Sequence, residues 1–270
     1  MSPQLTYQRK HWKEFCVDPR QSSPGLSALR YEPLLALIGP CGDVEGKKVL
    51  SPLADFFKRI VNSEAPFVLF NTLCASELIA IPKNNDLVFV RLISLVDVFC
   101  KIARNCVLHA ARSHIDRACG NLQWGAGRKM SMDIRYHSIK LATLSDKSRD
   151  LIIIADKTTP AESKTIYLRQ SRKLMSHMLP FLLAVYSEKS SSWLYDASAS
   201  ELREIVISTG VRQGDPLGPA LYALSDIVLL RMKAEGIHLH GFIAAYLDDE
   251  IAHVDYEKGK EYLTCCLEEG

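Results

Sequence analysis

Residues 242–254 combine two apolar runs with an acidic doublet, and this combination restricts the fold more than any other part of the chain. Residues 242–247 form an apolar run that leads into Asp248 and Asp249, and residues 251–254 alternate again. Two strand-like runs around a short polar turn predict a β-hairpin. Its apolar arms require a core, whereas its tip would present two carboxylates. Such oxygens suit Mg²⁺, which usually binds one or two protein carboxylates together with substrate phosphates.

The composition is that of a folded globular chain. Of the 270 residues, 47% are hydrophobic and 24% are charged, which is enough apolar material for a sizeable core. No apolar run approaches the roughly 18 residues of a membrane span. The N-terminus has no signal-peptide pattern, so we expect an intracellular protein, nuclear or cytoplasmic, with no membrane partner. The eight cysteines include no Cys-x-x-Cys pair, which favours free thiols over a zinc site.

The charge is distributed unevenly although the formal net charge is only +2. Residues 101–150 carry 10 basic and 4 acidic side chains, whereas residues 151–270 carry 12 basic and 17 acidic ones. A basic middle can bind phosphates, and an acidic end can hold metal ions that also bind phosphates. The alternative interpretation of the basic middle is a solvated helix face with surplus Lys and Arg.

The first half of the chain is expected to alternate helices with one hairpin. Residues 1–50 are rich in Pro and Gly and predict a loosely packed lead-in, with one short helix over residues 30–37. Another helix is expected over residues 51–64, with Ser51 as its N-cap and Pro52 in its first position. The remaining predictions are a hairpin with arms at residues 78–81 and 87–90 and an amphipathic helix over residues 95–118.

The second half is expected to hold the sheet beneath the acidic hairpin. Residues 150–156 are a continuous apolar run that ends in Asp156, which predicts a buried central strand. A helical pattern interrupted by Pro180 follows, and two strands are expected within residues 193–207. A helix from Pro216 to about residue 233 and an acidic helix over residues 256–269 complete the series. The apolar stripe of the first of these helices is predicted to be Leu217, Leu221, Leu224, Val228 and Met232.

One continuous block of sequence carries a family resemblance. Residues 210–219 read G-V-R-Q-G-D-P-L-G-P. This block resembles the turn block G-V-R-Q-G-D-P-L-S-P of reverse transcriptases, closest to the non-LTR retrotransposon type, with Gly218 in place of Ser. Residues 246–249, Y-L-D-D, are similar to the metal-binding hairpin [YF]-x-D-D of the same family. They follow the turn block by about 30 residues, as the family predicts.

The resemblance covers roughly residues 70–256 and implies a fold and an activity. The fold would be α/β (α+β): a right-hand polymerase palm around an antiparallel sheet, preceded by fingers, with the thumb missing. The implied activity is RNA-directed DNA synthesis, with an RNA template, a DNA primer and dNTPs as partners. Two Mg²⁺ ions are the implied cofactors, with Mn²⁺ as an alternative. The expected regions are a lead-in (1–60), a fingers-like region (61–148) and a palm (149–270).

The resemblance also assigns residues to the site. The implied catalytic carboxylates, which are also the metal ligands, are Asp156, Asp248 and Asp249. The nucleotide and template contacts would be Lys83, Arg91, Gln123, Arg212, Gln213 and Gly214. Here Lys83 and Arg91 would neutralise the triphosphate, since Arg fits a planar fork of oxygens and Lys a point contact. Asp215 is interpreted as a helix cap.

The stretch after Asp156 departs from the family, which reads approximately D-x-x-N-A-F-N. Ala161 stands where the family has the aromatic residue that packs under the nucleotide sugar. A second interpretation therefore remains open: a truncated or decayed element-derived protein that binds nucleic acid without catalysis. A third, an unrelated metal-dependent enzyme that uses the same carboxylates, does not account for the match at residues 210–219.

Overall fold

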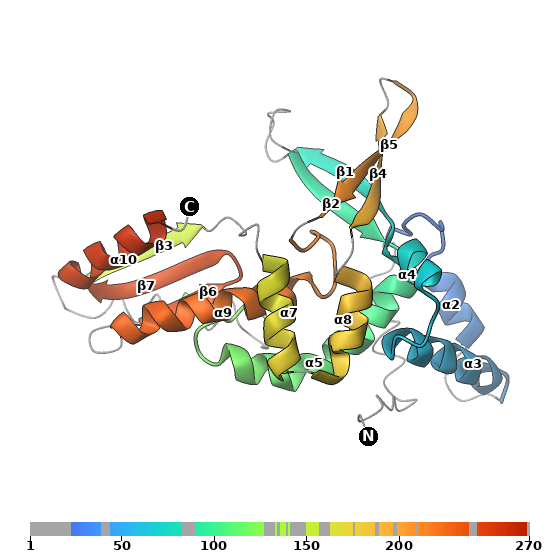
Figure 1. The fold of residues 1–270 in the computed structure, drawn as a ribbon, viewed down its shortest axis with the longest axis horizontal. Helices are drawn as coiled ribbons and strands as arrows, with labels where there is room; N and C mark the ends of the chain where they lie inside the picture. Colours follow the sequence, from blue (N-terminus) through green and yellow to red (C-terminus); the bar gives the residue numbers. More distant parts are fainter. Residues whose placement is uncertain are drawn as a thin grey trace. The chain divides into compact units, whose positions relative to one another are not determined.

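The computed structural model contains two compact units, and each is assembled from two stretches of sequence (Figure 1). Unit 1 comprises Met1–Ala110 and Ser171–Gly218, and unit 2 comprises Ala111–Gln170 and Pro219–Gly270. The expected regions 1–60, 61–148 and 149–270 stay predictions. The residues that the structure describes are 23–38, 44–82, 90–126, 133, 136–138, 140, 150–156, 163–174, 176–186, 189–196, 199–208, 210–237 and 242–268.

The helices of unit 1 pack around buried aromatic side chains. They are α2 (Tyr31–Ile38), α3 (Val44–Val61), α4 (Phe67–Cys74), α8 (Leu179–Tyr186) and the first part of α5 (Val98–Cys119). The ring centroid of Phe57 lies 5.9 Å from that of Phe99, and that of Phe70 lies 6.4 Å from that of Phe181. Edge and tilted contacts of this kind add to the free energy gained from burying the rings.

The short helix expected near residues 30–37 is confirmed as α2, but the expected start of the next helix is wrong. Helix α3 begins at Val44, so Pro52 lies inside it and Ser51 is not an N-cap. An interior proline removes one backbone hydrogen bond and costs about 3 kcal/mol. Burial of Leu50, Phe57 and other apolar side chains of the same helix compensates for this loss.

The sheet of unit 1 has four strands in the order β2-β1-β4-β5. Strands β1 (Ser76–Pro82) and β2 (Val90–Val96) form the expected antiparallel hairpin. Of its expected second arm, residues 87–89 lie outside the described residues. Strand β4 (Ser190–Asp196) runs parallel to β1 and antiparallel to β5 (Glu201–Ile207). The sheet is therefore mixed, and its one parallel pairing joins segments far apart in sequence.

The sheet of unit 2 is antiparallel, with the order β3-β7-β6. Strands β6 (Phe242–Tyr246) and β7 (Asp249–Asp255) form the hairpin expected around the acidic doublet. Strand β3 (Asp150–Asp156) has the expected bounds, but its expected central place is wrong. Among the described strands it pairs with β7 alone, and Ile154 is 64% exposed. A continuous apolar run therefore marked a strand here without marking burial on both faces.

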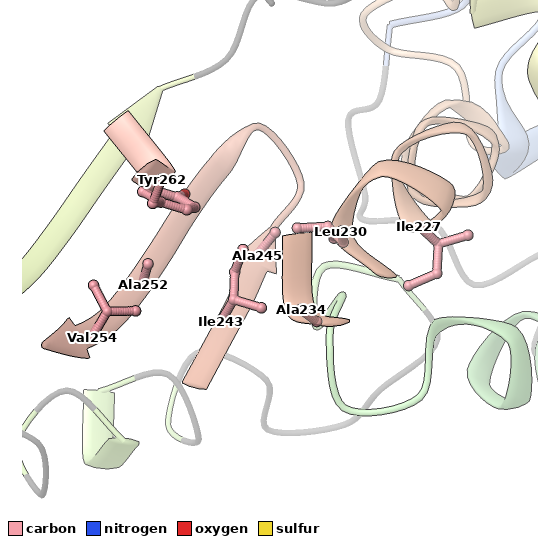
Figure 2. Close-up of a cluster of buried hydrophobic side chains, with 8 residues drawn as sticks. All are labelled: Ile227, Leu230, Ala234, Ile243, Ala245, Ala252, Val254 and Tyr262. Atoms are coloured by element: carbon pink, nitrogen blue, oxygen red, sulfur yellow. The ribbon is translucent and has the colours of Figure 1, made fainter. Parts of the chain in front are cut away.

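Helices α9 (Gly218–Ile237) and α10 (Tyr256–Glu268) cover one face of this sheet. Figure 2 shows Ile227, Leu230 and Ala234 of α9 and Tyr262 of α10 with side chains of β6 and β7. The strand residues in the cluster are Ile243, Ala245, Ala252 and Val254. Successive strand residues point to opposite faces, so Glu250 shares this core face whereas Asp249 and Tyr246 lie on the other. We call that second face the carboxylate face.

The predicted stripe of α9 is only partly right. Leu217, Leu221 and Leu224 are buried, but Val228 is 37% and Met232 is 65% exposed. The buried positions continue instead through Ile227, Leu230 and Ala234. Residues 220–227 are buried on every side, so no single stripe could describe that part of the helix.

The other expected elements are present. Helix α7 (Ser163–Leu174) is followed by the short helix η2 (Ser176–Met178) and by α8, with Pro180 in the first turn of α8. Two strands were expected within residues 193–207: β5 lies in this range, whereas β4 begins earlier, at Ser190. Helix α10 is the expected acidic helix. None of the helices described here combines the length and the apolar character needed to cross a bilayer.

Candidate catalytic site

The acidic doublet lies at the tip of the β6–β7 hairpin. Tyr246 pairs with Asp249, so Leu247 and Asp248 form a two-residue turn between the strands. Leu247 has a φ of 55°, in the left-handed region that non-glycine residues seldom adopt. Asp248 is exposed and Asp249 is half-buried. The hairpin therefore carries two adjacent carboxylates at its tip, one of them exposed to solvent.

Strand β3 brings the third predicted carboxylate position to the same place. Asp156, the last residue of β3, lies directly opposite Asp249 in the ladder of β3 and β7. Opposed residues of an antiparallel pair have Cα atoms about 4.5–5.5 Å apart and lie on the same face. The register thus places positions 156 and 249 together on the carboxylate face, with Asp248 in the adjoining turn. The opposite end of the same ladder pairs Asp150 with Asp255.

The residue types at this end of the sheet fit a hard divalent cation. Carboxylate oxygens are the ligands that Mg²⁺ takes from proteins, and it keeps its remaining positions for water and substrate phosphates. Among the described side chains, no group of three or more His, Cys, Asp or Glu could hold a metal ion. The side chain at position 156 is not among those described, and only its backbone register enters the comparison.

Glu250 follows Asp249 in β7 but points into the core. Its carboxylate is fully buried, Tyr262 donates a hydrogen bond to its Oε1 at 2.5 Å, and Lys233 Nζ lies 3.4 Å from the same atom. Lys233 also lies over the ring of Tyr262, 5.4 Å from its centroid. Because successive strand residues point to opposite faces, the carboxylate of Glu250 contacts side chains of α9 and α10, whereas Asp249 lies on the carboxylate face.

Gln123 lies beneath the hairpin tip and is completely buried. Its amide bonds to the backbone of Leu247 and to the carboxylate of Asp226 on α9. The segment around it pairs with β6 as a short parallel bridge between Gln123 and Ala245. The structure therefore brings Gln123 together with the acidic turn by contacts within unit 2.

The glycine-rich turn block lies in unit 1, where it is attached to β1 and β2. The backbone N–H of Ser94 donates to the carbonyl of Gln213 at 2.8 Å. Gly214 has a φ of 98°, and a Cβ there would lie 2.5 Å from the Ser94 carbonyl oxygen. Only glycine fits this close approach. The side chain of Gln213 itself is exposed.

Arg212 is partly buried and bonds within unit 1. Its Nη1 donates to the carbonyl of Cys74 at 2.5 Å and to Ser76 Oγ at 3.0 Å. Ser76 Oγ also shares hydrogen bonds with Ser94 and Ser192, so β1, β2 and β4 are joined at this point. Burial, and then the nearby charge of Arg104, lower the pKa of Arg212.

Asp215 and Arg104 form a buried ion pair, which with Tyr186 we call the Arg104 cluster. Arg104 is 1% and Asp215 is 3% exposed, and Nη1 lies 3.0 Å from Oδ2, close but poorly aligned for a hydrogen bond. Tyr186 donates to Asp215 Oδ2 at 2.7 Å, and the backbone N–H of Leu217 donates to Oδ1 at 2.9 Å. The helix-cap interpretation of Asp215 fits the bond to Leu217 but leaves out the ion pair.

The electrostatics of the Arg104 cluster follow from its burial. Desolvation and then the charge of Asp215 raise the pKa of Tyr186 well above its ordinary value, so the hydroxyl remains a donor. Desolvation acts to lower the pKa of Arg104, but Asp215 and Cys100 outweigh it, and the net shift is upward. A hydrogen bond from Cys100, aided by Arg104 and Arg212, lowers the pKa of the Cys74 thiol to about 6.

Sequence reasoning missed Arg104 as a buried residue. The helix α5 buries Cys100, Ala103, Val107 and Ala111, and Arg104 falls on the same face at helical spacing. A lone arginine among apolar positions spaced by three and four residues was the available sign that it needs a buried acidic partner.

The remaining predicted contacts are placed as follows. Arg91 is exposed on β2, opposite Ile81 of β1. Lys83 and Ala161 lie outside the described residues. Within unit 1 the structure therefore brings together Arg212, Gln213 and Gly214, and within unit 2 it brings together Asp156, Asp248, Asp249 and Gln123.

Comparison with known proteins identifies the fold but no family. Neither a protein-family model nor a curated protein matches the chain. Among solved structures, the apo telomerase of Candida tropicalis, truncated from its C-terminal domain, is similar with a TM-score of 0.51 and 8% sequence identity. The alignment covers 72% of this chain but only 46% of the telomerase chain. At this identity the likeness concerns the fold alone, which is mixed α/β.

Proposed function

We propose that the chain is the RNA-directed DNA polymerase domain of a retrotransposable element, of the non-LTR type. The observation that supports this proposal most directly is the pairing of β3 with β7. It sets Asp156 opposite Asp249, beside the turn that contains Asp248. Two chain segments far apart in sequence thus bring acidic positions to one end of one sheet. The likeness to telomerase, a reverse transcriptase-related enzyme, supports the same reading of the fold.

In this proposal the antiparallel sheet of unit 2 belongs to the palm, and the β1–β2 hairpin of unit 1 belongs to the fingers. The antiparallel sheet β3-β7-β6 holds the acidic positions on one face, while α9 and α10 cover the other. A rigid, covered sheet suits this task, because catalytic groups must stay within a fraction of an ångström of their productive geometry. The partners are an RNA template, a DNA primer and dNTPs.

Asp156, Asp248 and Asp249 would hold two Mg²⁺ ions, or Mn²⁺ in their place. When bound, such ions lower the pKa of the primer 3′-hydroxyl and neutralise the leaving pyrophosphate. The aspartates fix the ions relative to the sheet, and Asp248 is exposed enough to reach a ligand from solvent. In the reaction a bond forms from the 3′-oxygen to the α-phosphorus, the bond to the β-phosphate oxygen breaks, and the hydroxyl proton leaves to solvent.

The contacts to nucleotide and template are proposed for Lys83, Arg91, Gln213 and Gly214. Arg91 and Gln213 are exposed, so their side chains can reach a ligand. Arg212 is proposed to act mainly by holding the block, because its Nη1 already bonds to Cys74 and Ser76. Contacts to phosphate are independent of base sequence and weaken as salt concentration rises.

Primer extension on an RNA template with Mg²⁺ tests this proposal. We expect the wild-type chain to extend the primer and Asp248→Asn to lose activity by about 10³-fold or more, because removal of a charge that stabilises the transition state costs several kcal/mol. Glu257→Gln is the matched control, since it removes an exposed carboxylate from α10 at the same change in net charge. Salt-sensitive binding of primer–template without extension would instead support a nucleic-acid-binding protein that lacks catalysis.

A further inference from the structure

We propose that Gln123 is a positioning residue that holds the turn carrying Asp248 and Asp249 in its left-handed conformation. The inference about catalysis rests on the proposed function, whereas the contact itself does not. It assigns Gln123 a role beneath the acidic turn, in place of the template contact that the resemblance implies.

The amide of Gln123 uses its full bonding capacity within unit 2. Its Oε1 accepts from the backbone N–H of Leu247 at 2.8 Å and from that of Gly125 at 3.0 Å. Its Nε2 donates to the carbonyl of Leu247 at 3.2 Å and to Asp226 Oδ2 at 3.1 Å. A side-chain amide can accept two hydrogen bonds and donate two, so all four positions are filled. The residue is 0% exposed, which leaves no surface for an external ligand.

The turn needs this support because Leu247 has a φ of 55°. A left-handed backbone is unfavourable for a residue with a Cβ, and it persists only where the surroundings impose it. Gln123 bonds both backbone polar groups of Leu247, so one side chain imposes the orientation of both peptide planes. The next peptide leads directly into Asp248, and any relaxation of Leu247 would redirect the carboxylates.

The segment that carries Gln123 is itself fixed on two sides. The backbone N–H of Trp124 donates to the carbonyl of Ala245, and the N–H of Ala245 donates to the carbonyl of Leu122, both at 2.7 Å. Asp226 anchors the amide from α9, whose neighbouring Ile227 belongs to the core of the unit. The turn is therefore held in place relative to both the sheet and helix α9.

Gly125 provides an independent second contact to the same turn. A Cβ at position 125 would lie 2.6 Å from the backbone nitrogen of Leu247 and 2.6 Å from its Cγ. No real Cβ tolerates such distances to backbone, so the close approach of this segment to the turn requires glycine. The spacing Gln-x-Gly at residues 123–125 thus has one physical explanation for both residues.

Hydrogen exchange at the amide of Leu247 tests the contact without any catalysis. In Gln123→Ala we expect this amide to exchange at least about 10-fold faster, because its acceptor is gone, while the amide of Ala252 in the middle strand keeps its rate. Unchanged exchange at Leu247 in Gln123→Ala, or an equally large increase at Ala252, overturns the contact.

Kinetics in two backgrounds test the positioning role. We expect Gln123→Ala to lower kcat about 10- to 100-fold and to raise the Mg²⁺ concentration for half-maximal rate, with little change in KM for primer–template. Glycine adopts positive φ freely, so the same substitution should cost at least about 3-fold less in a Leu247→Gly background. An equal loss in both backgrounds overturns the role even if the exchange result holds.

The two measurements separate this inference from the proposed function. If the wild-type chain extends no primer but the amide of Leu247 responds as expected, the contact stands and the proposed polymerase activity fails. If the chain is active and Gln123→Ala extends primers at the wild-type rate, the activity stands and the positioning role fails.

Discussion

Two acidic sites of the chain, Asp215 in the Arg104 cluster and Asp248 at the hairpin tip, differ in what surrounds their carboxylates. Asp215 is 3% exposed, its oxygens accept hydrogen bonds from Tyr186 and from the backbone of Leu217, and Arg104 forms an ion pair with it, all within unit 1. Asp248 is exposed at the end of a sheet in unit 2. Both belong to sequence blocks that resemble reverse transcriptases, yet only the second is available to an external ligand.

A residue of a family motif can therefore stabilise the fold instead of taking part in catalysis. A buried carboxylate whose oxygens are already bonded stabilises its unit and cannot take a further ligand without losing those bonds. An exposed carboxylate contributes little to stability and can bind a cation. Substitutions in the Arg104 cluster should therefore lower stability, whereas substitutions at the tip should lower activity.

Asp215→Asn is expected to have the largest effect on stability. It leaves the Arg104 guanidinium buried without its counter-charge, which costs about 3–5 kcal/mol in the free energy of unfolding. Urea denaturation of the whole chain measures this loss. The control is Glu201→Gln in the exposed pair with Arg203, where the loss should stay below about 1 kcal/mol because solvent screens the charges. Equal losses in the two variants would contradict the distinction.

The same difference between a buried and an accessible carboxylate can be tested at two neighbouring residues of β7, with the variants Glu250→Gln and Asp249→Asn. Glu250 is fully buried against Lys233 and Tyr262, so its substitution should cost about 3 kcal/mol in the free energy of unfolding. Asp249→Asn should cost less than about 1 kcal/mol, yet abolish primer extension. Paired urea and activity measurements on both variants check this. A stability loss as large for Asp249→Asn would mean that the carboxylate face is structural too.

The thiol of Cys74 should make the Arg104 cluster sensitive to pH, with a smaller effect. Its pKa is about 6 in the folded chain, against an ordinary value of 9.0. A depressed pKa stabilises the folded state above pH 9, and this contribution is lost as the pH falls toward 6. Cys74→Ala should therefore cost more at pH 8 than at pH 6, by on the order of 1 kcal/mol. Urea midpoints at both pH values under reducing conditions decide this, and an equal or reversed difference would contradict it.

Local patterns predicted most of the elements. The bounds of β3, the hairpin of β6 and β7, the hairpin of β1 and β2 and the helix α5 follow from alternation, helical spacing and turn residues. These signals arise within about ten residues, and the sequence contains them in full. The start of α3 was misjudged because Pro52 is a strong local signal that burial of the helix overrides.

Contacts between distant segments could not be predicted. No local pattern shows that β3 pairs with β7, that β1 runs parallel to β4, or that the amide of Gln123 bonds to a residue 124 positions later. The left-handed conformation of Leu247 could not be predicted either, because leucine has no preference for positive φ. The sequence therefore indicates the candidate aspartates. Their placement on one face of the sheet, and the contact of Gln123 with their turn, depend on pairing between distant segments.

The central claim is that the β3–β7 register makes one end of the sheet catalytic, and the two ends of β3 provide a matched test. Asp156 lies opposite Asp249, whereas Asp150 lies opposite Asp255 at the other end of the same ladder. Primer extension on an RNA template should fall about 10³-fold or more in Asp156→Asn and stay within about 3-fold of wild type in Asp150→Asn. Equal activity in the two variants, whether both high or both low, would contradict the account.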